Sequence, residues 1–101
     1  MSQYRKRPIV VNAFQMESSV YNEELYWPKW IVEAFENKVM YYDMDSYIED
    51  GNYINDGKYQ VCIDTLEGIM YVDIDDWIIQ GVQKELYPCK PDIFAANYEP
   101  V

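Results

Sequence analysis

The sequence predicts an α+β domain: a small, curved, mainly antiparallel sheet of about five strands with one packed helix. Short runs that alternate apolar and polar residues, separated by turn residues, are typical of antiparallel strands. One stretch, WPKWIVEAFENK, instead repeats its apolar residues at helical spacing. The chain has 101 residues, half of them apolar, and fits a single globular domain over residues 1–101.

The first half of the chain contains one predicted strand and the helix. Residues 7–14, RPIVVNAF, are rich in β-branched residues, and Pro8 near their start is compatible with a strand. A single helical turn is expected at 22–26. The helix follows over 27–38, where Pro28 suits the first turn. Its apolar face carries Trp27, Trp30, Ile31, Ala34 and Phe35.

The second half predicts strands. VMYY at 39–42 is followed by a turn-rich connection over 43–57. KYQVCID and IMYVDI flank the turn TLEG and predict a hairpin, with Gly68 at a position that favours positive φ. DWIIQGV and ELY predict two more strands, joined by a tight turn near Gln83 and Lys84.

The segment YPCKPDIF, residues 87–94, predicts a stiff extended strap near the N-terminal strand. Pro88 and Pro91 fix two φ angles and restrict the residues before them. Ile93 and Phe94 are expected to anchor the strap in the core.

The net charge of −10 is unevenly distributed. The segment 39–79 carries most of the acids and a single base, Lys58, whereas Arg5, Lys6 and Arg7 form a basic cluster. Acidity favours a basic partner and argues against general nucleic-acid binding, which needs clustered cations. No apolar run approaches the roughly 20 residues of a membrane span. No signal peptide is recognised, so a cytosolic protein with two reduced cysteines is expected.

The residue types do not predict an enzyme. The chain has no histidine, which excludes the Ser-His-Asp and Cys-His nucleophilic systems and the usual zinc sites. Cys89 beside Lys90 has no base to accompany it, and the acids Asp73, Asp75 and Asp76 read as a solvated turn. We therefore predict no catalytic residues and no cofactor. DMDSYIEDG, from residue 43, resembles a calcium loop, but Ile48 and Ile54 replace the required glycine and glutamate. No metal site is predicted.

Two binding surfaces are candidates. The first is acidic and tyrosine-rich and would contact a basic protein; it comprises Asp43, Asp45, Tyr47, Glu49, Asp50 and Tyr53. The alternative is that its acids only maintain solubility and its tyrosines cap sheet edges. The second is a basic patch of Arg5, Arg7 and Lys90, which could hold an anionic ligand such as a nucleotide signal. Its alternative is an internal carboxylate partner such as Asp92.

Both ends of the chain and the hairpin turn resemble a family of small phage and prophage proteins. The resemblance rests on YRKRPIVVNAFQM, TLEG and DWIIQGVQKELYPCKPDIFAANYEPV, and the last of these is long and specific. Residues 17–57 carry little of it. Asp75 and Lys84 stand where the family tends to have glycine. The resemblance implies expression inside an infected bacterium, but no assigned activity and no binding residues.

Two function classes follow. The first is a non-enzymatic accessory protein in the cytoplasm of the infected host, which binds and inhibits or sequesters a host or anti-phage-defence component. The second is a structural or assembly accessory of the virion. A homo-oligomer is compatible with either class, whereas membrane association is not expected.

Overall fold

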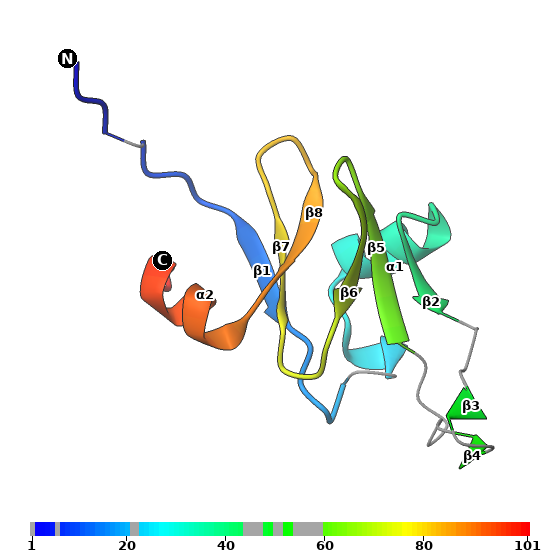
Figure 1. The fold of residues 1–101 in the computed structure, drawn as a ribbon. Helices are drawn as coiled ribbons and strands as arrows, with labels where there is room; N and C mark the ends of the chain where they lie inside the picture. The colour runs from blue at the N-terminus through cyan, green and yellow to red at the C-terminus, as the bar shows by residue number, and fades with distance from the viewer. Residues whose placement is uncertain (1, 6, 21–22, 44–47, 50–51, 54–59) are drawn as a thin grey trace.

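The computed structural model describes residues 2–5, 7–20, 23–43, 48–49, 52–53 and 60–101. Within them the predicted α+β class is confirmed (Figure 1). The strands are divided between small antiparallel sheets that do not close into a barrel, and the described residues form two α-helices rather than one.

Two three-stranded sheets form the body. The first has the order β1-β7-β8, built from β1 (Asn12–Gln15), β7 (Trp77–Gln80) and β8 (Leu86–Cys89). The second has the order β2-β5-β6, built from β2 (Met40–Asp43), β5 (Gln60–Thr65) and β6 (Gly68–Val72). β8 and β6 lie side by side in Figure 1. β3 (Ile48–Glu49) pairs with β4 (Asn52–Tyr53).

The hydrophobic core joins both sheets to the helix α1 (Lys29–Glu36). The alternation of each strand decides which residues enter it, because successive side chains point to opposite faces. Val61 and Ile63 of β5 and Ile78 of β7 are fully buried in this core. The remaining buried members are Met16, Trp27, Ile31, Ala34, Met40, Val72 and Leu86.

The segment that leads into α1 behaves largely as the sequence predicts. A short 3₁₀ helix, η1 (Glu24–Tyr26), precedes it, and Pro28 occupies the N-cap of α1. The N–H of Val39 donates to the carbonyl of Ala34 at 2.9 Å, and Lys38 beside it has φ of 61°. This left-handed residue closes α1 in the manner of a Schellman motif, where glycine is the usual choice.

The hairpin β5–β6 confirms the prediction made from TLEG. Thr65 pairs with Gly68, which has φ of 111°. The hydroxyl of Thr65 donates to the carbonyl of Gly68 at 2.7 Å and accepts from the N–H of Glu67 at 3.1 Å. The turn is therefore held by its own side chain as well as by the strand pairing.

The predicted strap over 87–94 is wrong in its second half. The chain is a strand only to Cys89, and Pro91 then begins the helix α2 (Pro91–Asn97). Proline is well tolerated at the first helical position because its missing N–H has no partner there in any helix. Ile93 is 52% exposed rather than buried, whereas Phe94 is half-buried against the β1-β7-β8 sheet.

The predicted strand over 7–14 is also too long at its start. β1 begins at Asn12, and residues 7–10 are exposed and unpaired in the described structure. Figure 1 shows this N-terminal segment projecting away from the sheets. Residues 2–5 and 7–11 are called the N-terminal arm below.

Two turn residues occupy the left-handed region that glycine prefers. Asp75 has φ of 75° and Lys84 has φ of 63°. We expect Lys84→Gly to raise the free energy of unfolding by about 0.5–1 kcal/mol, because the L-residue strain exceeds the entropy cost of glycine. Chemical denaturation measures this. Gln83 lies in the same turn but does not have positive φ, so Gln83→Gly should not raise the free energy of unfolding. Equal effects for the two variants would contradict left-handed strain at Lys84 as the cause.

Candidate functional site

An acidic, tyrosine-bearing surface covers the side of the β2-β5-β6 sheet that faces away from the core. Because Val61 and Ile63 point inward, the residues that alternate with them point outward. Cross-strand pairing brings Tyr41 and Tyr71 to either side of Cys62, and Ile69 opposite Asp64. We call this surface the outer face; it comprises Tyr41, Asp43, Gln60, Asp64, Ile69 and Tyr71, and Cys62 lies beneath them.

A hydrogen bond joins one tyrosine of the outer face to one of its carboxylates. The hydroxyl of Tyr41 donates to Oδ1 of Asp64 at 2.9 Å. Tyr71 and Ile69 are 54% and 57% exposed and offer apolar contact area beside these groups. Within the described part of the chain, no lysine or arginine forms an ion pair with Asp64. The face can therefore present both aromatic area and negative charge to a partner.

Cys62 lies beneath this surface and is not a reactive thiol. It is 1% exposed, and burial raises its pKa, with further contributions from the carboxylates of Asp43 and Asp64. A thiol with a raised pKa stays protonated at neutral pH, and the protonated form is a poor nucleophile. Cys62 therefore fills space in the sheet.

The pKa values of two tyrosines, Tyr41 and Tyr87, predict how the stability of the fold depends on pH. Desolvation and the hydrogen bond to Asp64 raise the pKa of Tyr41 to about 12, and desolvation and the hydroxyl of Tyr98 raise that of Tyr87 to about 12. Since these pKa values exceed the ordinary value of about 10, the fold favours the neutral phenol. The associated stability is present below pH 10 and is lost between about pH 10 and 12.

Tyrosinate absorbance during an alkaline titration measures this directly. We expect Tyr41 and Tyr87 to titrate late in the folded protein, so that Tyr41→Phe and Tyr87→Phe each remove one late-titrating group. If Tyr41→Phe removed an ordinary early-titrating group, the contact with Asp64 would be contradicted.

A second cluster of charges lies where β8 meets α2. Nζ of Lys90 is 2.7 Å from Oδ2 of Asp73 and 3.1 Å from Oδ2 of Asp76. Asp76 is 2% exposed, and the same oxygen accepts the backbone N–H of Asp73 at 2.9 Å. The two hydrogen bonds to carboxylates raise the pKa of Lys90. Lys90 is thus the counter-ion of a buried carboxylate, and its internal partners are Asp73 and Asp76 rather than the predicted Asp92.

Cys89 lies next to this cluster, in an environment that disfavours the thiolate form that a nucleophile needs. Burial raises the pKa of its thiol, and the negative charges of Asp76 and Asp92 raise it further. Lys90 does not lower it, because that ammonium group is held by the two aspartates. Cys62 and Cys89 are both free thiols.

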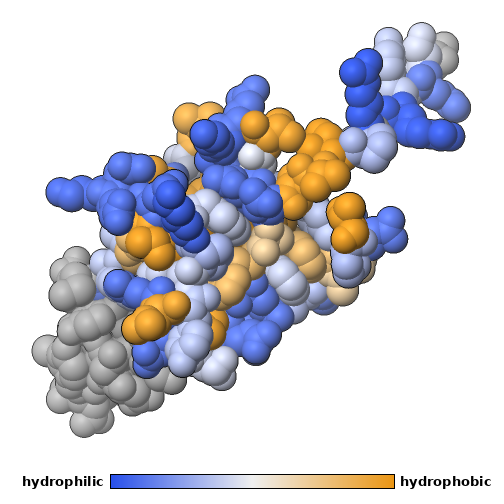
Figure 2. Space-filling view, turned by 180° about the vertical axis from the view of Figure 1, so that it is seen from behind, coloured by the Kyte–Doolittle hydropathy of each residue, from blue (hydrophilic) through white to orange (hydrophobic). Residues whose placement is uncertain are grey.

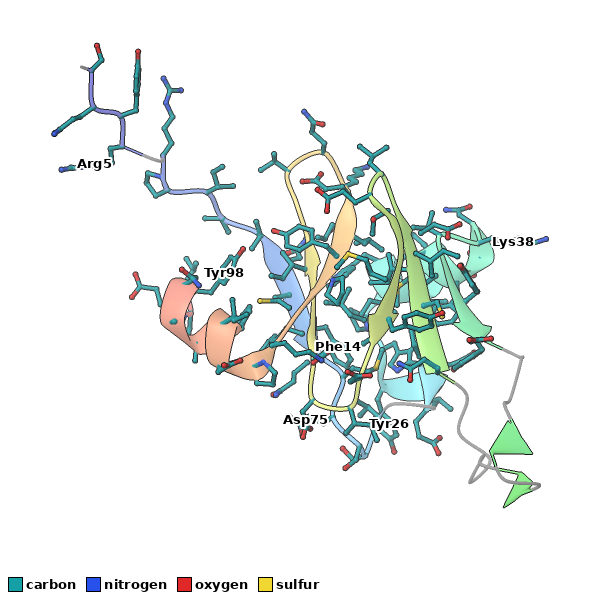
Figure 3. The ribbon with its side chains drawn as sticks, viewed as in Figure 1. Arg5, Phe14, Tyr26, Lys38, Asp75 and Tyr98 are labelled. Atoms are coloured by element: carbon teal, nitrogen blue, oxygen red, sulfur yellow. The ribbon has the colours of Figure 1, made fainter. Side chains whose placement is uncertain are left out.

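An aromatic stack fixes α2 on the β1-β7-β8 sheet. The rings of Trp77 and Phe94 are parallel within 6°, with centroids 3.9 Å apart, and Tyr98 stacks on Phe94 at 4.9 Å. The hydroxyls of Tyr98 and Tyr87 are 3.3 Å apart. Figure 3 shows Tyr98 between α2 and the sheet. This cluster is structural, since its rings cover one another.

The predicted binding residues lie in three places. Of the acidic surface, Asp43 is half-buried at the end of β2, on the outer face. Glu49 and Tyr53 belong to β3 and β4. Asp45, Tyr47 and Asp50 lie outside the described residues. These assignments stay predictions.

The predicted basic patch is not assembled by the described structure. Lys90 is paired at the start of α2, whereas Arg5 lies near the tip of the arm, away from the sheets (Figure 3). Arg7 is on the same exposed arm. Anion binding by the three residues together stays a prediction, without support from their arrangement.

Sequence reasoning missed Asp64 and Tyr71 as members of the outer face. The alternation in KYQVCID and IMYVDI indicates which residues share a face, and the turn at Gly68 sets the pairing of the two strands. Cross-strand neighbours could then have been read from the register. The pairing of β5 with β2 could not, since a long connection separates them.

Comparisons of the chain with protein-family models, with curated proteins and with solved structures give no match. Among the described residues, no group of acidic or cysteine side chains is arranged to hold a metal ion. None of the described helices has the length and apolar character that crossing a membrane requires.

Proposed function

We propose that this protein is a non-enzymatic binding protein whose outer face contacts a basic region of a partner protein. The carrying observation is the arrangement of Tyr41, Asp64 and Tyr71 on one face of a three-stranded sheet. Tyrosine supplies rigid contact area at low entropy cost, and carboxylates select a cationic partner. The net charge of −10 would speed the encounter with such a partner.

The chemistry of the remaining groups supports binding rather than catalysis. The chain has no histidine. Both thiols have raised pKa values, and the buried carboxylate of Asp76 is bonded to Lys90. No other candidate nucleophile paired with a base emerges from the described residues.

The resemblance to phage and prophage proteins suggests the setting. The protein then acts in the cytoplasm of an infected bacterium, where the partner is a host or anti-phage-defence component that it inhibits or sequesters. A basic cleft of such a component, for example one that contacts nucleic acid, has the charge that the outer face would fit.

Affinity capture from a host lysate, followed by mass spectrometry, tests this function. We expect one basic protein to be captured by the parent and to be lost with Asp64→Lys or Tyr71→Ala. Glu36→Lys reverses an exposed charge on α1 and is the matched control, which should retain the partner. Binding should also weaken steeply with added salt, because exposed charges are screened.

A partner that binds Asp64→Lys as well as the parent would exclude the outer face. Co-sedimentation with phage particles, with no captured host protein, would instead favour the virion accessory function.

A further inference from the structure

We infer that two copies of this chain pair along β1, each N-terminal arm extending the strand and lying against the other copy. The surface is distinct from the outer face and does not depend on the function proposed above. Its basis is the combination of an unpaired strand edge, an exposed arm that continues the strand, and opposite charges at the two ends.

The edge of β1 is open in the described structure. The sheet order is β1-β7-β8, so β1 has a strand neighbour on one side only. An open edge presents unpaired N–H and C=O groups, which favour pairing with another strand. Proteins often protect such edges with charges, prolines or bulges, but Asn12, Ala13 and Phe14 form a regular, uncharged run in β1.

The arm continues this edge as apolar, β-branched chain. Ile9 and Val10 are 51% and 73% exposed, although both residues favour strands and burial. Figure 2 shows hydrophobic surface, in orange, where the arm joins the body. The molecule extends 57 Å in its longest direction against 32 and 24 Å in the others, and Figure 1 shows the arm projecting from the body.

Charge selects a second copy as the occupant of the edge. In the sequence, residues 2–11 include three of the chain's eight basic residues, Arg5, Lys6 and Arg7, and none of its 18 acids. The remaining chain therefore carries five bases and 18 acids, a formal charge of −13. At the far end of β1, Glu17 is exposed, and the N–H of exposed Asp75 donates to the carbonyl of Met16 at 2.8 Å. An antiparallel pair would bring each basic arm to this acidic end of the other copy.

The hydrogen bonds of β1 restrict the register. The N–H of Met16 donates to the carbonyl of Asp76, and its carbonyl accepts from Asp75, so both of its groups point toward β7. Because these directions alternate, the odd-numbered residues point to the open edge. A two-fold axis must then lie at a residue position, odd or even, so that odd-numbered residues of one copy pair with odd-numbered residues of the other. An axis at Val11 pairs residues 7–15 over their full length and places Arg5 opposite Glu17. Pro8 falls at an even position, where no outward N–H is needed.

A cysteine cross-link tests the register. With Val11 on the axis, the two Cα atoms lie about 5.5 Å apart, within the range of a disulfide. We expect Val11→Cys in a Cys89→Ser background to form a covalent dimer on mild oxidation. Val10→Cys is the matched control, because its copies are offset by about 7 Å along the strand and about 5 Å across it. That separation exceeds the limit of about 7 Å for a bridge.

Sedimentation velocity of the full chain tests the dimer itself. We expect a species of twice the 12.1 kDa monomer mass. Ile9→Pro removes an outward N–H from each copy and should weaken dimerisation about tenfold. Since the arm lies outside the sheets, this variant should keep the parent's circular dichroism. Arg5→Glu should also weaken the dimer, and adding Glu17→Arg should restore it.

A parent that stays monomeric at the highest soluble concentration would overturn the inference. So would a dimer that resists Ile9→Pro and does not cross-link through Val11→Cys, since another surface would then mediate it. A complex that forms only with a different protein through this edge would replace the second copy as occupant.

Discussion

Replacing Phe94 with alanine is expected to lower the free energy of unfolding by about 2–3 kcal/mol. A fully buried phenylalanine costs about 3–5 kcal/mol when truncated, and Phe94 is only half-buried. The loss includes both ring contacts, to Trp77 at 3.9 Å and to Tyr98 at 4.9 Å. The stack joins α2 to the sheet, so its loss should release the helix before the body unfolds.

Ile93→Ala is the matched control for this prediction. Ile93 precedes Phe94 in the same helix but is 52% exposed, so its truncation should cost less than about 1 kcal/mol. Urea denaturation followed by far-ultraviolet circular dichroism gives the two stabilities. The fluorescence of Trp77 reports whether α2 stays docked; it is taken as the difference from matched Trp77→Phe proteins, because Trp27 and Trp30 also emit. Equal losses for Ile93→Ala and Phe94→Ala would mean that the stack does not anchor the helix.

The elements that the sequence predicts well are those whose signals are local. The hairpin β5–β6 depends on Gly68 and Thr65 within one turn, and α1 on apolar spacing and Pro28 within one helix. Both signals are complete within a dozen residues. No distant part of the chain is needed to interpret them.

The C-terminal helix could not be predicted because the local sequence favours extended chain, whereas a contact with a distant residue favours a helix. Pro88 and Pro91 both favour extended chain before them, and Lys90 is indeed extended, with ψ of 147°. Helical conformation from Pro91 onward is favoured by the stacking of Phe94 on Trp77, and Trp77 lies on β7, a strand that precedes the segment in the sequence. The same holds for the arm: Ile9 and Val10 have strand propensity, but the described chain offers them no strand to pair with.

The candidate site was predictable in its character but not in its members. Acidity and tyrosine content indicated the surface, and Asp43 lies on it. Asp64 and Tyr71 join it only through the pairing of β5 with β2 and β6. The sequence DIDDW likewise does not reveal which acid is buried. The left-handed backbone at Asp75 leaves that residue exposed and Asp76 buried.

Removing the buried carboxylate with Asp76→Ala is expected to cost about 1–3 kcal/mol of stability. The substitution leaves the N–H of Asp73 without its acceptor at a site with 2% exposure, and such a loss carries the desolvation penalty of the unpaired group. Lys90 would keep only Asp73 as a partner, at 2.7 Å. Denaturation in urea at neutral pH measures the change.

Lys90→Met removes the cationic partner of Asp76. Its effect on stability is compared with that of Lys29→Met. Lys29 is paired with Glu33 at 3.7 Å on the exposed face of α1, and such surface pairs contribute little. Loss of Lys90 instead leaves the carboxylate of Asp76 buried without its counter-ion, which is far less favourable. We therefore expect Lys90→Met to be the more destabilising variant.

A double variant separates the pair from its surroundings. If Asp76 and Lys90 stabilise the fold through each other, Asp76→Ala with Lys90→Met should cost less than the sum of the single losses. The fold raises the pKa of Lys90 above 10.5, so this contribution should be complete below pH 10.5 and disappear as the pH rises through the higher value. The Asp76→Ala protein should lose less stability over that alkaline range than the parent. Additive single losses, or a Lys90→Met protein no less stable than Lys29→Met, would show that Asp76 does not need Lys90 as its counter-ion.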